Sequence, residues 1–452
     1  MLDGSHPTID FAAVRTTEFG RLDAHGIAYL DFAASGLYGA SQVAEYAHRL
    51  EQGVYGNPHS EHTPSRASSR DLEQARQWAL DFFAADPALY EVIFTANTSA
   101  AIKLVAESYA FGPARGLVLS ADNHNSVNGM REYARKREAP IHVLPLDKDL
   151  RLDHAADRLD VSARRMGSGL LAFPAQSNFS GVKHELSLVQ QAQALGFDVL
   201  VDAAGCGIGS RLSLAAHPAQ FLAFSFYKLF GLPTGLGALM TRRDALARLR
   251  RPWFAGGTVD FVSVEHDRHL LSAGHHGFED GTPAFLDAAA VDIGFRFLNR
   301  FPAEVVSRRL LALTGGFLEH AAALRHCNGA PLARIYGPRD LTARGATVAF
   351  NLIGPEGRPI PYGEVEARLC AQGVAMRGGC FCNPGAAEAA FGFANLPVAA
   401  CLDALRGRFN LPALQACLGP DHAVGALRLS VGLPTTTGDL DRVCEGLATF
   451  AA

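Results

Sequence analysis

The fold of this chain is decided by one stretch, Phe221-Leu-Ala-Phe-Ser-Phe-Tyr-Lys228-Leu-Phe-Gly231, which continues as Leu-Pro-Thr-Gly-Leu-Gly237-Ala-Leu-Met240. The apolar and aromatic run is too short for a stable helix, and the glycines after it break regular structure. This pattern predicts a buried strand with Lys228 at its end.

Lys228 stands out because only five of the 41 basic residues are lysines and the others are arginines. At the end of a buried strand an ammonium group loses hydration, which lowers its pKa and makes the neutral amine available as a nucleophile or base. A neutral lysine can form a Schiff base, whereas arginine cannot. The alternative is a structural lysine whose stem packs on the strand end while its charge reaches water.

The composition indicates an ordinary globular protein. At 452 residues the chain exceeds the size at which one core keeps growing, so we expect two domains. Its net charge of −4 gives no reason to expect a nucleic acid or an acidic membrane as partner. Met1 to Pro7 lack a signal-peptide pattern, and no apolar run reaches membrane-spanning length. We therefore expect a cytoplasmic enzyme.

The eight cysteines are scattered through the chain: Cys206, Cys327, Cys370, Cys380, Cys382, Cys401, Cys417 and Cys444. A chain of this size needs no covalent staples, so disulfides are not expected. Cys380 and Cys382 are spaced too closely for the usual zinc pair, and no metal site is expected. The sequence predicts reduced thiols, one of them a candidate reactive group.

Two helix starts are predicted before the first strand. Ser41 is a candidate cap for a helix that buries Val43, Ala47 and Leu50, and Ser68-x-x-Asp71 resembles a capping box. From residue 91 short apolar runs alternate with helical patterns, and the expected strands are 92–94, 117–119, 141–144, 170–173, 199–201, 221–226 and 238–240. Strands without in/out alternation, separated by helices, favour a mostly parallel sheet covered on both faces. Ligands of such sheets bind beyond the carboxyl ends of the strands.

Polar groups follow several of these strand ends. They are the hydroxyls of Thr98 and Ser99 before a helix, the imidazole of His124, the amide of Asn178, the carboxylate of Asp202, and Ser225 and Tyr227 beside Lys228. Each of these residues could instead have a purely structural role: Thr98 could cap its helix, for example, and His124 could be a surface-loop histidine. Together they supply what pyridoxal 5'-phosphate (PLP) requires: an amine for the imine, a partner for the ring nitrogen, a stacking ring, a phenolate partner and a phosphate site.

Several ordered motifs resemble the class V aminotransferase group, and within it most of all the N-terminal, cysteine desulfurase-like domain of molybdenum cofactor sulfurases. They are Asn57-Pro-His-Ser60, Asp122-Asn-His124, Gln176-Ser-Asn-Phe-Ser-Gly181, Asp202-Ala-Ala204, Ser225-Phe-Tyr-Lys-x-Phe-Gly-x-Pro-Thr-Gly235, Phe278-Glu-Asp-Gly-Thr282 and Arg377-Gly-Gly-Cys-Phe-Cys-Asn-Pro-Gly385. The resemblance covers nearly the whole chain. It implies an α/β fold of the PLP-dependent transferase type I, with a mostly parallel central sheet and a smaller C-terminal α+β domain.

The resemblance also implies roles for single residues. Lys228 is the Schiff-base lysine, Asp202 the partner of the pyridine nitrogen, and His124 the ring that stacks on the cofactor and assists catalysis. The remaining cofactor contacts are Ala204 on the other ring face, Asn178 near the phenolic oxygen, and Thr98, Ser99, Ser225, Tyr227 and, from the second subunit of a homodimer, Thr282 at the phosphate. Candidate substrate contacts are Arg428, Arg377, Ala34 and His59.

Cys382 matches the position of the persulfide-forming cysteine, in a loop whose glycines and proline indicate flexibility. The alternative is an inert core cysteine. Sulfurases of this type often carry another cysteine where this chain has Ala387, and a C-terminal domain that handles the molybdenum cofactor, whereas this sequence ends at Ala452. The sulfur acceptor, a protein or a cofactor, is therefore not identified.

We expect an N-terminal segment (1–29) packed on the small domain, a large PLP-binding domain (30–300) and a small domain (301–452) that carries the Cys382 loop. The expected reaction converts L-cysteine to L-alanine and leaves a persulfide on Cys382. Two alternatives remain: a PLP-dependent lyase or aminotransferase that does not need Cys382, and a non-catalytic sulfur-relay or binding protein.

Overall fold

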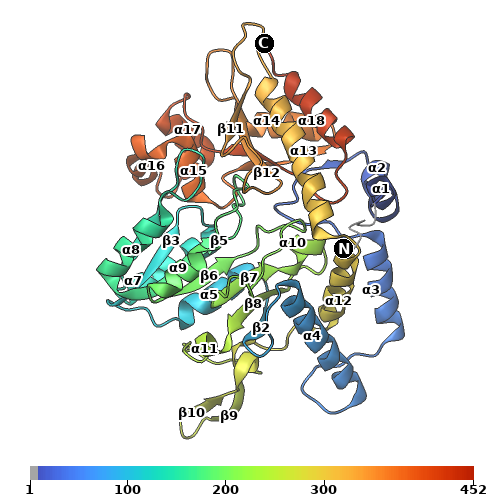
Figure 1. Ribbon diagram of the computed structural model, residues 1–452, viewed down its shortest axis with the longest axis vertical. Coiled ribbons are helices and arrows are strands. Elements are labelled where there is room, and N and C mark those ends of the chain that lie inside the picture. Colours follow the sequence, from blue (N-terminus) through green and yellow to red (C-terminus); the bar gives the residue numbers. More distant parts are fainter. Residues whose placement is uncertain (1–8) are drawn as a thin grey trace, which may run out of the picture.

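The computed structural model describes residues 9–452, and its centre is a seven-stranded sheet (Figure 1). The strands lie in the order β2-β8-β7-β6-β5-β3-β4. Their bounds are β2 Tyr90–Thr95, β3 Arg115–Ser120, β4 Ile141–Leu144, β5 Ser168–Pro174, β6 Phe197–Asp202, β7 Phe221–Ser225 and β8 Gly237–Arg242. β8 is antiparallel to both neighbours, and the other adjacent pairs are parallel. The mostly parallel sheet and the seven strands predicted from the sequence are confirmed, with ends that differ by a few residues.

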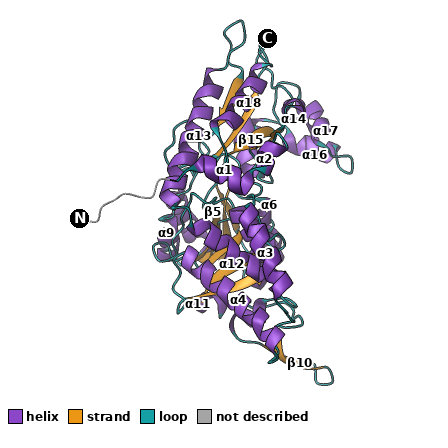
Figure 2. Ribbon diagram, turned by 90° about the vertical axis from the view of Figure 1, so that its right-hand side faces the viewer, coloured by secondary structure: helices purple, strands orange, loops and turns teal. Residues whose placement is uncertain are grey.

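Helices cover both faces of this sheet (Figures 1 and 2). Successive residues of a strand point to opposite faces, so Val199 and Val201 join one apolar cluster while Leu200 joins the other. The first face is covered by α4 Thr63–Phe82, α8 Ala155–Met166, α9 Leu188–Ala194 and α12 Phe285–Asn299, and the second by α5 Thr98–Ser108, α7 Met130–Lys136 and α11 Arg243–Leu246. Burial on both sides explains why these strands are continuous apolar runs.

Lys228 lies beyond the strand rather than within its last residues. β7 ends at Ser225, and Lys228 sits in the single helical turn α10, Phe226–Phe230. Gly231 closes this turn with a φ of 80°, a left-handed conformation that glycine adopts without strain, and its N–H donates to Tyr227 O. The turn directs the lysine to the carboxyl edge of the sheet.

Both predicted helix starts are wrong. α4 begins at Thr63, where the His62 imidazole accepts a hydrogen bond from Ser65 N, and Ser68 and Asp71 lie inside the helix. The helix α3, Ala40–Gln52, is preceded by Gly39, and Ser41 instead donates to Glu18. The expected apolar face of α3 is not buried in this chain, since Val43 and Leu50 are exposed.

A second, antiparallel sheet forms most of the C-terminal part, drawn in orange and red in Figure 1. Its order is β11-β12-β15-β14, with bounds β11 Ala333–Tyr336, β12 Thr347–Leu352, β14 Arg377–Gly379 and β15 Ala426–Ser430. The helices around it are α13 Ala303–Ala323, α14 Tyr362–Ala371, α15 Pro384–Phe391, α16 Val398–Ala404, α17 Leu411–Leu418 and α18 Thr437–Ala448.

The described part of the N-terminal segment contacts this second sheet region. It contains α1 Phe11–Phe19, α2 Arg21–Ala24 and β1 Ala28–Tyr29, and β1 pairs in parallel with β13, Val374–Ala375. Arg15 is buried and donates to Asp439 at 3.0 Å. Residues 1–8 of the predicted segment, which include the sequence examined for a signal peptide, lie outside the described residues. The predicted domain boundaries stay predictions.

The expectation of reduced thiols is wrong for one pair. Cys401 and Cys417 form a disulfide that joins α16 to α17. The two helices fold back on each other around a small apolar cluster of Leu414, Leu418 and Val424, which brings the two Cα atoms within 5.9 Å. Such a distance permits a disulfide, and the sequence separation of 16 residues carried no signal of it. The remaining six cysteines are free thiols.

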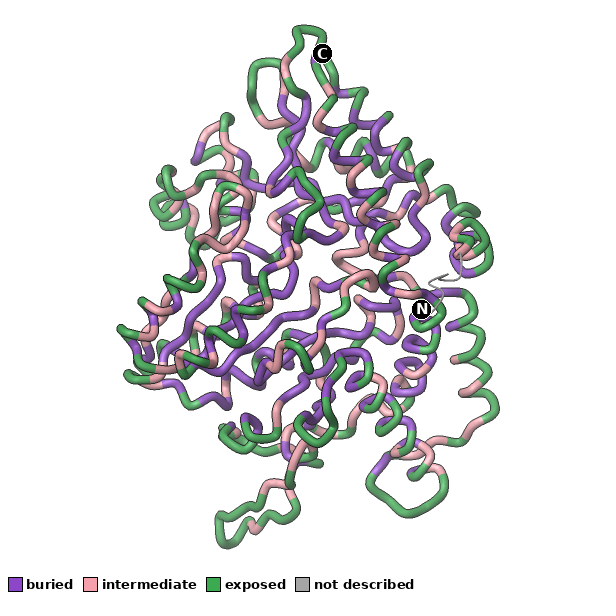
Figure 3. The backbone as a smooth tube through the Cα atoms, viewed as in Figure 1, coloured by how far each residue is buried: buried purple, intermediate pink, exposed green. Residues whose placement is uncertain are grey.

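One hairpin projects from the lower end of the molecule in Figure 1 and is mostly exposed in Figure 3. It consists of β9 Val259–Ser263 and β10 Arg268–Leu271 and carries the exposed apolar side chains of Phe261, Val264 and Leu270. Between residues 9 and 452, no helix is both long and apolar enough to cross a membrane.

Candidate active site

A cavity of about 280 Å³ opens at the carboxyl edge of the large sheet. Its walls come from the ends of β2, β5, β6 and β7 and from the loop after β3. The structure thereby brings together most of the predicted cofactor contacts: Thr98, Ser99, His124, Asn178, Asp202, Ala204, Ser225, Tyr227 and Lys228. These residues are far apart in sequence, and the parallel strand order is what gathers them.

Lys228 lies at the base of this cavity with a depressed pKa. Burial is the largest cause, and the positive charge of Arg428 acts in the same direction. The carboxylate of Asp202 and the thiol of Cys382 oppose this shift without reversing it. Part of the side chain remains accessible from the cavity. The amine is therefore more readily neutral than an exposed lysine and able to act as a nucleophile or base.

His124 precedes the short helix α6, Asn125–Asn128, and is mostly buried. Its Nδ1 accepts a hydrogen bond from Ser126 N at 3.1 Å, so the proton of the neutral ring is assigned to Nε2. Burial lowers the pKa of His124, and the charges of Lys228 and Arg428 lower it further, against the opposing effect of Asp202. The ring is thus held as a neutral imidazole in the wall of the cavity.

Asp202 ends β6 and is 5% exposed. Its Oδ1 accepts a hydrogen bond from Ala204 N at 2.9 Å, while Oδ2 accepts none from any residue between 9 and 452. A buried carboxylate with one free oxygen needs a cationic or donor partner. A protonated pyridine nitrogen in the cavity would be such a partner.

The amino end of α5 forms an anion site in the same cavity. Thr98 and Ser225 share a hydroxyl contact of 2.6 Å, and Ser99 and Ser126 share one of 2.5 Å. Asn97, and not Thr98 as one interpretation of the sequence had it, caps the helix by accepting from Ala100 N. The Thr98 hydroxyl is therefore not used as the helix cap, and these hydroxyls lie at a helix terminus that favours a negatively charged group such as phosphate.

Cys382 is exposed on the turn between β14 and α15, next to this cavity. Its carbonyl accepts a hydrogen bond from Asn125 N at 2.7 Å, which places the residue beside His124. Phe381 and Cys382 have φ angles of 57° and 56°, in the left-handed region that non-glycine residues adopt only when contacts hold them. The loop that the sequence indicated as flexible is anchored at several points.

Cys380, two residues earlier, has a different environment. It is half-buried, and its thiol donates to Val424 O at 3.2 Å. Burial, and after it the neighbouring Cys382 and Glu388, raises the pKa of the Cys380 thiol. A thiol in such surroundings is a poor nucleophile, because the thiolate is the reactive form.

The two predicted arginines meet at one carboxylate. Arg428 is 3% exposed and donates to Asp31 Oδ1 at 2.9 Å and to Asn178 O at 2.9 Å. Arg377 donates to Asp31 Oδ2 at 2.8 Å and keeps about half of its side chain exposed, 52%. Burial lowers the pKa of Arg428, whereas its hydrogen bond to Asp31 raises that of Arg377. Arg377 is the more available of the two cations.

Three predicted residues lie apart from this cavity. His59 is exposed with a φ of 78° near His276, and Thr282 is exposed and accepts a hydrogen bond from Asn57 at 3.3 Å. Ala34 belongs to the turn 31–36, in which its N–H donates to Asp31 O.

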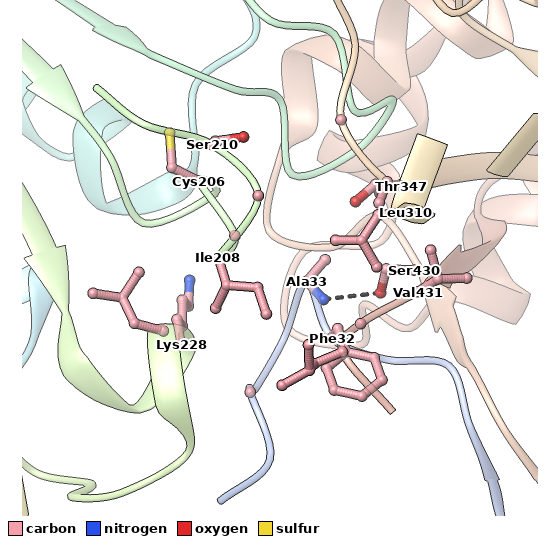
Figure 4. Close-up of a pocket in the computed structure, with 18 of the residues that line it drawn as sticks. Phe32, Ala33, Cys206, Ile208, Ser210, Lys228, Leu310, Thr347, Ser430 and Val431 are labelled. Carbon is pink, nitrogen blue, oxygen red and sulfur yellow. Dashed lines mark hydrogen bonds between the residues drawn. The ribbon is translucent and has the colours of Figure 1, made fainter. Parts of the chain in front are cut away.

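A second, smaller cavity of about 80 Å³ adjoins Lys228 on the side of this turn (Figure 4). Phe32, Ala33 and Ser430 line one side and Cys206, Ile208 and Ser210 another, as the labelled side chains show. Burial raises the pKa of Cys206 to about 12, so this thiol stays protonated.

Residues missed in the sequence also shape the site. Gln176 and Ser126 line the main cavity, Asp31 holds both arginines, and Asp122 and Asn383 are buried and bonded to each other. Asp122, Gln176 and Asn383 lie within the sequence motifs quoted above, whereas Asp31 does not. Their partners could not be predicted, because each partner is distant in sequence.

Comparison with known proteins yields close relatives. The chain is 35% identical over 464 residues to the molybdenum cofactor sulfurase of Solanum lycopersicum, an alignment that covers 94% of this chain and 55% of the relative. It is 34% identical to the molybdenum cofactor sulfurase of Bos taurus, covering 94% of this chain and 50% of the relative. This chain thus spans about half of the length of these relatives.

Solved structures show the same fold. A cysteine desulfurase of Thermococcus onnurineus NA1 superposes with a TM-score of 0.79 at 23% identity, covering 98% of each chain. A cysteine desulfurase of Escherichia coli superposes with a TM-score of 0.77 at 20% identity, with the same coverage.

Residues 28–443 match the model of the aminotransferase class-V family, whose members use PLP. The donor set of the cavity fits that cofactor: a buried lysine amine of lowered pKa, the oxygen of Asp202 that accepts no hydrogen bond from the described residues, and a hydroxyl-lined helix terminus. Because the match extends over most of its length, the chain belongs to the aminotransferase class-V family.

Proposed function

We propose that this protein is a PLP-dependent cysteine desulfurase that converts L-cysteine to L-alanine and holds the sulfur as a persulfide on Cys382. One observation carries the proposal: an exposed thiol is fixed by its own backbone to Asn125, beside His124 and the cavity that contains Lys228. A lyase or an aminotransferase has no need of a thiol in this place. The names of the relatives agree with this reaction class.

Lys228 is the proposed base. When bound, PLP supplies the Schiff-base carbonyl and stabilises negative charge at the substrate Cα. Because burial and Arg428 lower its pKa, the Lys228 amine is available to take the proton from Cα and to return it. The free oxygen of Asp202 would hold the ring-nitrogen proton, and the Thr98 and Ser225 hydroxyls would hold the phosphate.

Cys382 then accepts the sulfur. Its thiolate attacks Sγ of the substrate, an S–S bond forms, and the Sγ–Cβ bond breaks with its electron pair left on carbon. Protonation of that carbon gives alanine, and Cys382 keeps the sulfane sulfur as a persulfide. His124 is neutral and donates from Nε2, so it is suited to exchange a proton with the substrate thiol.

Arg377 and Arg428 are the proposed carboxylate contacts. Arg377 is half exposed and can turn one guanidinium edge toward the substrate while it keeps a bond to Asp31. Arg428 is buried, but its Nε has no hydrogen-bond partner among residues 9–452.

Thr282 and His59 are proposed to serve a second copy of the chain. Both are exposed on neighbouring loops outside the cavity of their own chain, as a contribution across a homodimer interface requires. The nearby β9–β10 hairpin exposes Phe261 and Leu270, which such an interface would cover.

Hybrid dimers test the assignment of Thr282. A mixture of Lys228→Ala and Thr282→Ala subunits assembles one intact site if Thr282 acts on the partner, and activity returns. A mixture of Lys228→Ala and Asp202→Asn subunits is the control, since both residues act in their own chain and no intact site forms. Equal failure of both mixtures would place Thr282 in its own chain, and full activity of Thr282→Ala by itself would place it in no site.

The sulfur acceptor is proposed to be a protein or cofactor outside this chain, and the names of the relatives make the molybdenum cofactor the first candidate. A cytoplasmic location is part of the proposal, because exposed thiols such as Cys370 and Cys382 favour a reducing compartment. The disulfide between Cys401 and Cys417 argues against this location, because disulfides are rare in reducing compartments.

The decisive experiment measures alanine and enzyme-bound persulfide formed from L-cysteine. Wild type and Cys370→Ala, which removes another exposed thiol, should give both products, while Cys382→Ala should give neither and keep its PLP absorbance. Wild-type turnover in Cys382→Ala, or an absence of alanine in a PLP-loaded wild type, would contradict the proposal and favour the lyase or aminotransferase interpretation.

A further inference from the structure

Asp122 is a fully buried carboxylate that takes no part in the chemistry described above. It lies just beyond β3 and does not line the cavity. Its Oδ1 accepts hydrogen bonds from Ser177 Oγ and Asn383 Nδ2, both at 2.7 Å, and its Oδ2 contacts His184 Nε2 at 2.8 Å. One side chain thus joins the ends of β3 and β5 to the Cys382 loop.

Asn383 connects this carboxylate to the residues around it. Its Nδ2 also lies 2.9 Å from Asn178 Oδ1, and its Oδ1 accepts from Ala386 N as the cap of α15. Asn178 in turn donates to Phe381 O at 2.7 Å. The residues before and after Cys382 are therefore both bonded to the sheet edge through one connected set of side chains.

The backbone of the same loop lies tightly against the sheet. Gly385 approaches Ala121 so closely that a Cβ at this position would lie 2.1 Å from Ala121 O. With the bond from Asn125 N to Cys382 O, these contacts maintain the left-handed conformation of Phe381 and Cys382.

We propose that Asp122 is a positioning residue that, through Asn383, holds Cys382 over the Lys228 cavity, so that the thiol works from a docked loop and the sulfur acceptor must come to it. The reason for a carboxylate is chemical. Ser177, Asn383 and His184 all present donors, and an ionised carboxylate accepts from all three, whereas an amide oxygen accepts fewer and its NH₂ opposes a donor. The role of Cys382 as sulfur carrier rests on the proposed function, but the docking of its loop does not.

The test compares Asp122→Asn with Asp198→Asn in the PLP-loaded enzyme. Asp198 is also buried and accepts from Tyr109, Arg115 and Arg248, at the opposite end of β6, so its variant controls for general loss of a buried acid. Hydrogen exchange of segment 377–386 and the rate of Cys382 alkylation by iodoacetamide report loop docking without any turnover. Steady-state kinetics with L-cysteine then show whether loss of loop docking lowers turnover.

Asp122→Asn should raise both the hydrogen exchange of segment 377–386 and the alkylation rate of Cys382. It should lower kcat by on the order of 10- to 100-fold, because displacement of a reacting group by about 1 Å costs this much rate. KM and the PLP spectrum should stay nearly unchanged. Asp198→Asn should leave all these quantities at wild-type levels while its thermal midpoint falls. Asn383→Ala removes the link between Asp122 and the loop, so it should raise exchange and alkylation in the same way, and the double variant Asp122→Asn/Asn383→Ala should add little to either single change. Independent folding defects would instead add up.

Unchanged exchange and alkylation in Asp122→Asn would overturn the proposal, as would equal changes in Asp198→Asn. If the wild type forms no alanine while loop protection still depends on Asp122, the desulfurase function fails and the positioning role stands.

Discussion

Arg428 Nη2 lies 2.9 Å from Asp31 Oδ1, and this buried ion pair joins the N-terminal turn to β15. Asp31 also binds Arg377 through its other oxygen, at 2.8 Å. One carboxylate thereby orients two guanidinium groups of very different exposure, 3% for the side chain of Arg428 and 52% for that of Arg377.

Substitution of the two arginines by alanine should separate stability from substrate binding. Arg428→Ala leaves Oδ1 of the buried Asp31 carboxylate without its partner and should cost about 3 kcal/mol of unfolding free energy. Arg377→Ala removes the half-exposed partner of the pair and leaves Asp31 its bond to Arg428, so it should cost less, about 1 kcal/mol, yet still raise KM for L-cysteine. Urea unfolding and initial rates measure the two effects. Arg358→Ala, which breaks the exposed pair with Asp421, is the control and should change neither.

The stability of the cofactor-free protein should depend on the ionisation of Lys228. The pKa of Lys228 in the folded chain lies below the ordinary 10.5, so the unfolded chain binds the proton more strongly. Between the folded pKa and 10.5 the unfolding free energy should therefore rise with pH, and below that window the buried charge destabilises the fold in full. Lys228→Met should unfold at a higher temperature than wild type at neutral pH, and the difference should shrink toward pH 10.

Lys103→Met is the control for this measurement, because Lys103 keeps 66% of its side chain exposed and should show no such trend. A stabilisation by Lys228→Met that grows as the pH rises would contradict the assignment.

The large sheet and the groups at its strand ends were predictable from the sequence for a local reason. A short apolar run followed by glycine marks a buried strand, so Lys228 and Asp202 could be placed at strand ends without knowledge of their neighbours. The contacts that orient the site could not be predicted this way. Asp122 and Asn383 are separated by 261 residues, and Asp31 and Arg428 by 397, so only the packing of the two sheets brings them together.

The errors have the same physical origin. Ser68-x-x-Asp71 has the spacing of a capping box, but Asp71 is held inside α4 by an ion pair with Arg49, and Pro64 in the first turn was the better marker of the helix start. The face of α3 that carries Val43 and Leu50 has helical periodicity, which identifies an apolar stripe but not what covers it.

Reduction of the disulfide should loosen α16 and α17 selectively. The bond closes a loop of 16 residues, for which chain entropy predicts a stabilisation of about 3 kcal/mol. Dithiothreitol should therefore raise amide exchange in residues 396–420 and leave the strands of the large sheet unchanged. Cys401→Ser should reproduce the effect without reductant, and Cys370→Ser should not. Equal exchange before and after reduction would show that the apolar cluster of Leu414 and Leu418 holds these helices without the bond.

Gly385→Ala should release the Cys382 loop by steric means, independently of Asp122. The added Cβ would lie 2.1 Å from Ala121 O, a backbone atom that cannot move aside without shifting the end of β3. Because alanine favours a helix more than glycine by about 1 kcal/mol, α15 itself should not be weakened. We expect faster alkylation of Cys382 and a fall in kcat with the PLP spectrum retained. Gly363→Ala, in α14 with open space at the same atom, is the matched control. If Gly385→Ala instead leaves Cys382 as protected as in wild type, the close contact with Ala121 does not hold the loop.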